Sequence, residues 1–275
     1  MTVREIAKIL ADSGIEPDTA RYEARLLVSH FTGCSFSELV AFPERDYSNT
    51  ELSNAVKKRA GRYPLQYIIG KWEFCGLSFR INESVLIPRP DTEVIACAAA
   101  SDCPESGSVL DLCTGSGCIA AAVLSMVPDA HCTAVELYPD AAAVARENIE
   151  SLGFGSRCVV IIGDATTDLF ADDVKFDVIV SNPPYVTSDE MNELDAELSA
   201  EPSHALTDGG DGLSIIESII GLYRKHMAQD GVMIIEHGWR QSAAAAEIAE
   251  KYSLDHTEIR DYGGNIRGVR LKRRI

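Results

Sequence analysis

The sequence predicts an α/β protein in which a doubly wound parallel sheet with an antiparallel edge hairpin follows a small helical domain. Residues 1–63 carry apolar side chains at helical spacing between short polar breaks, as a helical bundle does. From residue 91 onward, short apolar runs alternate with helical stretches, which is typical of βα units around a parallel sheet. The last two apolar runs follow each other through a short segment that contains residues 261–264, so we expect those runs to pair as a hairpin.

The first 63 residues predict a helical bundle whose helices have recognisable ends. One helix precedes Gly14, and a second begins at Pro17 and ends before Gly33. Ser35 and Glu38 have the spacing of a capping box at the start of a third helix. A fourth is expected to open near residue 48 and to run to about residue 62. No residue in this domain suggests chemistry, so we expect it to recognise a partner.

The remaining chain divides into a linker, residues 64–90, and a second domain, residues 91–275. The linker contains aromatic and apolar residues alternating around Gly76, which predicts a β-hairpin. It ends in Ile87-Pro88-Arg89-Pro90, an extended segment because proline disfavours helix at and before its own position. In the second domain we expect strands at 109–112, 131–136, 158–162, 176–181, 231–236, 254–260 and 267–273.

Composition limits the partners of this chain. Lys and Arg number 25 against 42 Asp and Glu, a net charge of −17, which disfavours a duplex nucleic acid as the partner. The N-terminus has no apolar leader, and no apolar run approaches the roughly 20 residues of a membrane span. The eight cysteines show no C-x-x-C pair or zinc spacing, so we expect reduced thiols and no metal. We therefore expect a soluble, cytoplasmic protein without membrane association.

A ligand site is predicted where the first strands of the second domain end. Glycines let a backbone approach a ligand, and the following helix adds partial positive charge at its N-terminus. A carboxylate about 20 residues later suits ribose hydroxyls, and one after the third strand suits an adenine amine. A dinucleotide site or a purely structural tight turn explains the glycines as well. A helix N-cap explains the carboxylate after the third strand. The residues concerned are Asp111, the turn Cys113, Thr114, Gly115, Ser116 and Gly117, then Glu136 and Asp164.

The segment Asn182-Pro183-Pro184-Tyr185 follows the fourth strand and predicts methylation of a planar nitrogen. An amide or aromatic amine nitrogen is a poor nucleophile because its lone pair is delocalised. The Asn182 side-chain oxygen and the Pro183 carbonyl can both accept hydrogen bonds from one NH2 group, which orients it toward a methyl donor. The prolines make the loop rigid, and Tyr185 is expected to offer a flat wall to the substrate. A rigid strand-ending loop is the alternative explanation.

The chain resembles the peptide chain release factor glutamine methyltransferases, the PrmC/HemK family, over nearly its whole length. The resemblance rests on motifs that are more discriminating than the glycine turn. These are Gln66–Gly70 with Trp72–Phe74, Ile87–Glu93, Asn182–Tyr185, Glu201-Pro202, Glu236–Gly238, and Arg260–Tyr262 with Asn265 and Arg267.

The resemblance implies a Rossmann-like class I methyltransferase sheet and S-adenosylmethionine as donor, with S-adenosylhomocysteine as product. The family methylates the N5 side-chain amide of the glutamine in the Gly-Gly-Gln motif of class I release factors. Carried over, the turn Cys113–Gly117, Glu136, Asp164 and Ala165 hold the donor, and Asn182 contacts both donor and glutamine. Pro183, Pro184 and Tyr185 complete the glutamine pocket, and the helical domain docks the release factor.

This chain departs from the family pattern at three positions. Cys113 replaces the first glycine of the turn, which requires a shifted or strained backbone if that position has positive φ. Ala165 replaces an aromatic residue that packs on adenine, and Ser199 replaces an arginine. Arg89 is either a carboxylate clamp near the methionine end of the donor or part of an inter-domain ion pair.

Three other functions compete with the release-factor assignment. Adenine-N6 methylation of DNA or RNA uses the same Asn-Pro-Pro-Tyr logic, but the net charge of −17 disfavours it. Glutamine methylation of a ribosomal protein is the second alternative, and the motifs at 87–93 and 260–267 favour release factors over it. A non-enzymatic scaffold with an inherited pocket is the third, and it would be indicated if Cys113 abolished donor binding.

Overall fold

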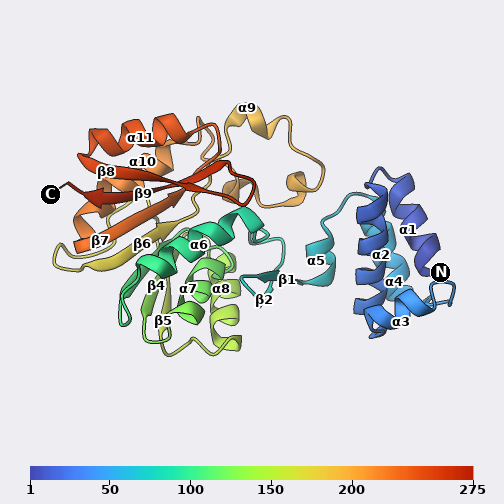
Figure 1. The fold of residues 1–275 in the computed structure, drawn as a ribbon. Helices are drawn as coiled ribbons and strands as arrows, with labels where there is room; N and C mark the ends of the chain where they lie inside the picture. Colours follow the sequence, from blue (N-terminus) through green and yellow to red (C-terminus); the bar gives the residue numbers. More distant parts are fainter. Residues whose placement is uncertain (275) are drawn as a thin grey trace. The chain divides into compact units, whose positions relative to one another are not determined.

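The computed structural model describes residues 1–274 and contains two compact units (Figure 1). Met1–Lys71 and the short segment Asp195–Ala200 form the first unit. Trp72–Leu194 and Glu201–Ile275 form the second. The division expected from the sequence, at residues 63 and 90, remains a prediction about independently folding domains. Among the described residues, no helix is both long and apolar enough to cross a membrane.

Helices make up the first unit, and their apolar faces meet in one core. The helices are α1 (Val3–Asp12), α2 (Pro17–Thr32), α3 (Phe36–Ala41), α4 (Thr50–Ala60) and α5 (Leu65–Ile69). Pro17 occupies the first turn of α2, and Gly33 ends that helix in the left-handed conformation, as the sequence predicts. The core includes fully buried Leu10, Leu27 and Leu52, one from each of three helices. Helix α5 was not predicted from the sequence.

The capping box expected at Ser35 is incomplete. Ser35 Oγ accepts from the backbone N–H of Glu38, but the Glu38 carboxylate pairs with Arg45 instead of returning to the cap. Complete boxes occur at Thr2 with Glu5 and at Thr187 with Glu190. Spacing alone does not show whether the glutamate has a competing cation within reach.

One sheet organises the second unit, and its order places the carboxyl ends of the central strands side by side. In the described residues the order is β5-β4-β3-β6-β7-β9-β8, parallel from β5 to β7 and antiparallel for β9 and β8. The edge hairpin is thereby confirmed, with β9 next to β7. The strands are β3 (Ser108–Leu112), β4 (His131–Glu136), β5 (Cys158–Ile162), β6 (Phe176–Ser181), β7 (Met227–Glu236), β8 (Leu254–Arg260) and β9 (Ile266–Arg273). A separate hairpin pairs β1 (Lys71–Phe74) with β2 (Leu77–Arg80).

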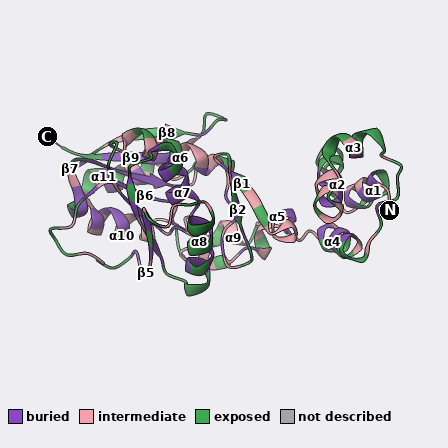
Figure 2. Ribbon diagram, turned by 90° about the horizontal axis from the view of Figure 1, so that it is seen from below, coloured by how far each residue is buried: buried purple, intermediate pink, exposed green. Residues whose placement is uncertain are grey.

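Helices cover both faces of this sheet, so its central strands β3, β6 and β7 are largely buried on both sides, whereas the edge strand β8 is mostly exposed. Figure 1 shows α6 (Pro90–Asp102), α7 (Cys118–Met126) and α8 (Pro139–Ser151) on one face, with α10 (Ser214–Tyr223) and α11 (Ser242–Lys251) on the other. Figure 2 shows α7 as almost entirely buried, in agreement with its apolar sequence. A one-turn helix, α9 (Ser188–Met191), lies in the segment that follows β6.

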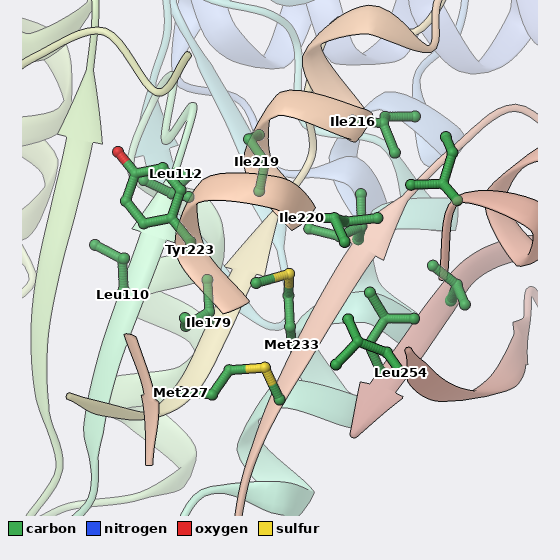
Figure 3. Packing of buried hydrophobic residues seen from close by; sticks show 14 of the residues in the cluster. Leu110, Leu112, Ile179, Ile216, Ile219, Ile220, Tyr223, Met227, Met233 and Leu254 are labelled. Atoms are coloured by element: carbon green, nitrogen blue, oxygen red, sulfur yellow. The ribbon is translucent and has the colours of Figure 1, made fainter. Parts of the chain in front are cut away.

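The core on the α10 face explains the position of that helix. Ile216, Ile219 and Ile220 of α10 are fully buried and pack with Leu110 and Met233 of the sheet (Figure 3). Burial of one such side chain stabilises the folded protein by about 1.5–3 kcal/mol. This packing fixes α10 and the segment before it, which carries residues of the site described next.

Candidate active site

A cavity of about 270 Å³ opens where β3, β4 and β6 end, the place at which ligands bind in sheets of this kind. It brings together most of the residues predicted from the sequence. The predicted residues that line it are Arg89, Cys113, Thr114, Gly115, Ser116, Glu136, Asp164, Ala165, Asn182 and Pro184. Four others, Asp111, Gly117, Pro183 and Tyr185, do not line it. Among the described residues, no group of three His, Cys, Asp or Glu side chains is arranged to hold a metal ion.

The turn after β3 alternates between ordinary and left-handed backbone. Cys113, Gly115 and Gly117 have φ values of +60°, +56° and +78°. Glycine adopts this conformation freely, whereas a residue with a Cβ is strained there by roughly 1–2 kcal/mol. The turn has therefore not shifted to accommodate Cys113; it retains the glycine-type conformation and carries strain.

Asp111 lies beneath this turn and supports it. The Oδ2 atom accepts from Thr114 Oγ1 at 2.6 Å and from the backbone N–H of Ala120 at 3.2 Å. The side chain is fully buried, and burial raises its pKa to about 7. Asp111 thus positions the turn without contacting the cavity.

Glu136 joins the end of β4 to the same turn. Its two carboxylate oxygens accept from the backbone N–H groups of Gly115, at 2.9 Å, and Tyr138, at 3.0 Å. Each carboxylate oxygen has a second lone pair, so Glu136 retains capacity to accept from hydroxyl groups in the cavity.

The end of β5 provides a carboxylate but no aromatic surface. Asp164 Oδ1 accepts from the backbone and hydroxyl of Thr166 at 2.8 and 2.7 Å, so it closes a local turn while lining the cavity. Ala165 is buried in the core. The cavity wall nevertheless contains an aromatic pair, because the rings of Tyr138 and His204 lie with centroids 3.6 Å apart and planes inclined at 32°. Burial lowers the pKa of His204.

The loop after β6 is anchored by side chains from three distant parts of the chain. Asn182 Nδ2 donates to Thr92 Oγ1 at 3.2 Å, while Tyr185 donates its hydroxyl to Glu236 Oε1 at 3.1 Å. Gln241 Nε2 donates to the Tyr185 carbonyl at 3.0 Å. Burial, followed by the charge of Glu236, holds the pKa of Tyr185 well above its usual value. Tyr185 packs against the core and serves as an anchor of the loop.

Arg89 lines the cavity and pairs with the buried carboxylate of Glu201. The second Glu201 oxygen accepts from the backbone N–H of Ile87 at 3.0 Å. All three residues belong to the second unit, so the ion pair holds the extended segment before α6 within that unit.

The residues behind the Asn-Pro-Pro-Tyr loop were not predicted from the sequence as part of the site. Thr92 and Glu236 were each recognised only as part of a family motif, and Thr92 lies in the first turn of α6, a helix that was not predicted. Gly212 was also missed, although a Cβ there would meet the carbonyl of Tyr185. The one sequence signal that could have identified such a residue was the apolar pattern of a buried strand that ends in the acidic residue Glu236.

Both parts of the chain match known protein families. Residues 2–70 match the family described as "PrmC N-terminal domain", and residues 92–232 match "Methyltransferase small domain". Curated relatives called "Release factor glutamine methyltransferase" span almost the same length. The protein from Geobacter sulfurreducens is 38% identical over 85% of this chain and 81% of its own length. The one from Moorella thermoacetica is 33% identical over 97% of both chains.

Solved structures share the fold at low sequence identity. The catalytic domain of hMettl16, crystallised with an RNA hairpin, superimposes with a TM-score of 0.58 at 15% identity, covering 82% of this chain and 83% of that one. A ribosomal protein L11 methylase from Lactobacillus delbrueckii gives 0.52 at 18% identity, covering 72% and 86%. At these identities the likeness shows a methyltransferase fold alone.

Proposed function

The chain belongs to the release factor glutamine methyltransferase family, and from this we propose that it methylates a glutamine side-chain amide in class I release factors. The acceptor is the glutamine of their Gly-Gly-Gln motif, and the donor is S-adenosylmethionine. One observation carries the proposal: Asn182 and the glycine turn line the same cavity. The Asn182 amide, which can orient a substrate nitrogen, therefore faces the same cavity as the turn that can hold the nucleoside of the donor.

The residues present fit the donor. Ser116 Oγ is buried at the turn without a hydrogen-bond partner among the described residues, which leaves a polar atom for a ligand. Glu136 supplies acceptors for ribose hydroxyls, and Asp164 supplies one for an exocyclic amine. The Tyr138–His204 pair provides an aromatic surface that Ala165 lacks. When bound, S-adenosylmethionine supplies an electrophilic methyl group on a sulfonium and leaves as S-adenosylhomocysteine.

The Asn-Pro-Pro-Tyr loop acts on the glutamine nitrogen. We assign its two N–H groups to Asn182 Oδ1, on the cavity wall, and to the carbonyl of the next loop residue, Pro183, which does not itself line the cavity; both contacts direct the nitrogen lone pair away from the loop. As the new N–C bond forms, the nitrogen becomes acidic and releases one proton to water. The loop therefore needs to orient the amide, and Tyr185 contributes by fixing the loop to Glu236 and Gln241.

The net charge of −17 is the observation that separates this function from adenine methylation. Tight binding of a nucleic acid needs clustered cations to replace the counterions of its phosphates. The match of residues 2–70 to the PrmC N-terminal family also favours a release factor over a ribosomal protein, and we propose that this helical region contributes to docking.

The decisive experiment incubates the purified chain with S-adenosylmethionine and a class I release factor, followed by peptide mass spectrometry. We expect one added methyl group on the Gly-Gly-Gln glutamine and none when that glutamine is replaced by alanine. Unmodified release factor beside methylated DNA or ribosomal protein would reject the proposal.

Substitution of Asn182 tests the mechanism separately. We expect Asn182→Ala to lower kcat by at least about 100-fold, because the amide loses a positioning acceptor. Donor binding should weaken but stay measurable by calorimetry. Turnover close to that of the unaltered chain would contradict the role given to Asn182.

A further inference from the structure

Behind the cavity, four polar side chains, Asn182, Thr92, Tyr185 and Glu236, lie together around a buried carboxyl. Asn182 Nδ2 lies 3.2 Å from the hydroxyl of Thr92, which lines the cavity from α6. The Thr92 hydroxyl also interacts with the carboxyl of Glu236 at the end of β7, whose buried Oε2 has no other partner among the described residues, while Tyr185 donates to Glu236 Oε1 at 3.1 Å. Thr92 and Glu236 are 2% and 1% exposed, so bulk water does not compete for these bonds.

The charge on Glu236 sets which group donates and which accepts in the hydrogen bonds among these four side chains. A carboxylate only accepts, so the hydroxyls of Thr92 and Tyr185 must both donate to it. Thr92 has a single hydroxyl proton, and once that proton is directed at Glu236 its oxygen can only accept. The end of the Asn182 amide that faces Thr92 must then be the NH2 group.

The orientation of the Asn182 amide decides whether it can help the reaction. With NH2 directed at Thr92, Oδ1 is the end left for a ligand, and it accepts no hydrogen bond from the described residues. In the reverse orientation an NH2 group would face the NH2 group of the substrate, and two donors repel. The two orientations have nearly the same shape, so packing alone does not select between them.

We propose, on the premise of the function above, that Thr92 and Glu236 are positioning residues that fix the Asn182 amide with its oxygen toward the substrate nitrogen. Glu236 acts through Thr92 and touches neither substrate nor donor. In this way a carboxylate behind the cavity makes Asn182 an acceptor at the reacting nitrogen.

The groups around Glu236 shift the pKa of its carboxyl in opposite directions. Burial raises its pKa to about 7, and the hydrogen bonds from Thr92 and Tyr185 act against this. Arg267 on β9 favours the charged form, whereas Asp91 on α6 disfavours it. Cys118 of α7 also faces Glu236, and His237 follows it in sequence. Falling pH should therefore protonate Glu236 and release the Thr92 hydroxyl from its fixed direction.

The first test compares Thr92→Val with Thr92→Ser in the release-factor assay. Valine keeps the shape and removes the hydroxyl, so we expect kcat to fall by roughly 10- to 100-fold, the effect of losing alignment of a reacting group. Serine keeps the hydroxyl and should restore kcat to within about threefold of the unaltered chain. Donor affinity, measured by calorimetry, should change by less than about threefold in both variants. Equal kcat values for the two variants would overturn the proposal.

The second test measures orientation without turnover. In 15N-labelled protein, the Asn182 side-chain amide signals, assigned by their loss in Asn182→Ala, should shift with a midpoint near pH 7. Glu236→Gln should abolish this titration. A titration that persists in Glu236→Gln would overturn the proposal, since Asp111 also has a pKa of about 7 and would then be the group observed. Because this test needs no acceptor, it separates failure of the inference from failure of the proposed function.

Discussion

Gly212 tests whether the position of the Asn-Pro-Pro-Tyr loop controls activity. A Cβ at this residue would meet the carbonyl oxygen of Tyr185 well inside van der Waals contact and would lie 2.7 Å from its carbonyl carbon. It would also lie 2.6 Å from Gln241 Nε2, which holds the same carbonyl. Non-bonded carbon atoms are stable at about 3.5–4.0 Å, so Gly212→Ala must displace the Tyr185 backbone by about 1 Å.

The expected loss follows from that displacement. A misplacement of about 1 Å in a positioning group costs roughly 100-fold in rate. Gly212 also has φ +74°, so alanine adds about 1–2 kcal/mol of backbone strain to the folded state. We therefore predict a kcat about 100-fold lower for release-factor methylation and a loss of at least about 1 kcal/mol in the free energy of unfolding.

Gly209 provides a control for the strain. It lies in the same loop with φ +80°, but a Cβ there has no atom within 4 Å. Gly209→Ala should lose about the same free energy of unfolding while keeping kcat within about threefold. The two variants are compared by steady-state methylation and by urea unfolding. Equal loss of kcat in both would refute the reasoning, because strain alone would then explain the effect.

Three further predictions concern stability, each checked by urea unfolding at fixed pH. Cys113→Gly should be more stable than Cys113→Ala by about 1 kcal/mol, the reverse of the usual order, because both lose the sulfur and only alanine keeps the strain at φ +60°; a more stable alanine variant would contradict this. Arg59→Met should cost about 3–5 kcal/mol, since it leaves the buried carboxylate of Glu23 unpaired; a cost below about 1 kcal/mol would contradict it. Burial raises the folded pKa of Asp111 from 3.8 to about 7, so its contribution to stability is complete only below pH 3.8, shrinks as the pH rises and is lost as the pH passes 7. The unfolding free energy of Asp111→Asn should therefore fall less between pH 5 and 7 than that of the unaltered chain.

The sequence predicted the sheet well because each strand is marked by local patterns. β4, β5, β6 and β8 have the predicted bounds, and the hairpin of β8 and β9 pairs at the edge as expected. Buried parallel strands have continuous apolar runs, which few other elements imitate. β7 was predicted too short because its first residues, Met227 to Asp230, are interrupted by polar side chains.

Elements without such patterns were missed. Helix α6 begins at Pro90, two residues after Pro88, and is rich in alanine, so its apolar side chains form no clear stripe. Helix α5 is a single short turn before a glycine. The turn residues of the cavity were predicted because the first strand and the next helix bracket them. The Tyr138–His204 contact was not, since the two rings lie 66 positions apart in sequence.

The Asn-Pro-Pro-Tyr motif illustrates a further limit on prediction. It specifies residue types, and from these a planar nitrogen was predicted, but an asparagine side chain can accept or donate in the same place. Whether Asn182 accepts or donates depends on Thr92, which lies 90 residues before it in the sequence. It depends also on Glu236, which contacts Tyr185 of the motif and lies 51 residues after it. Neither spacing is a periodicity of helix or strand, so no local pattern links them. The chemistry of the motif thus depends on a charge outside it, whose position only the fold reveals.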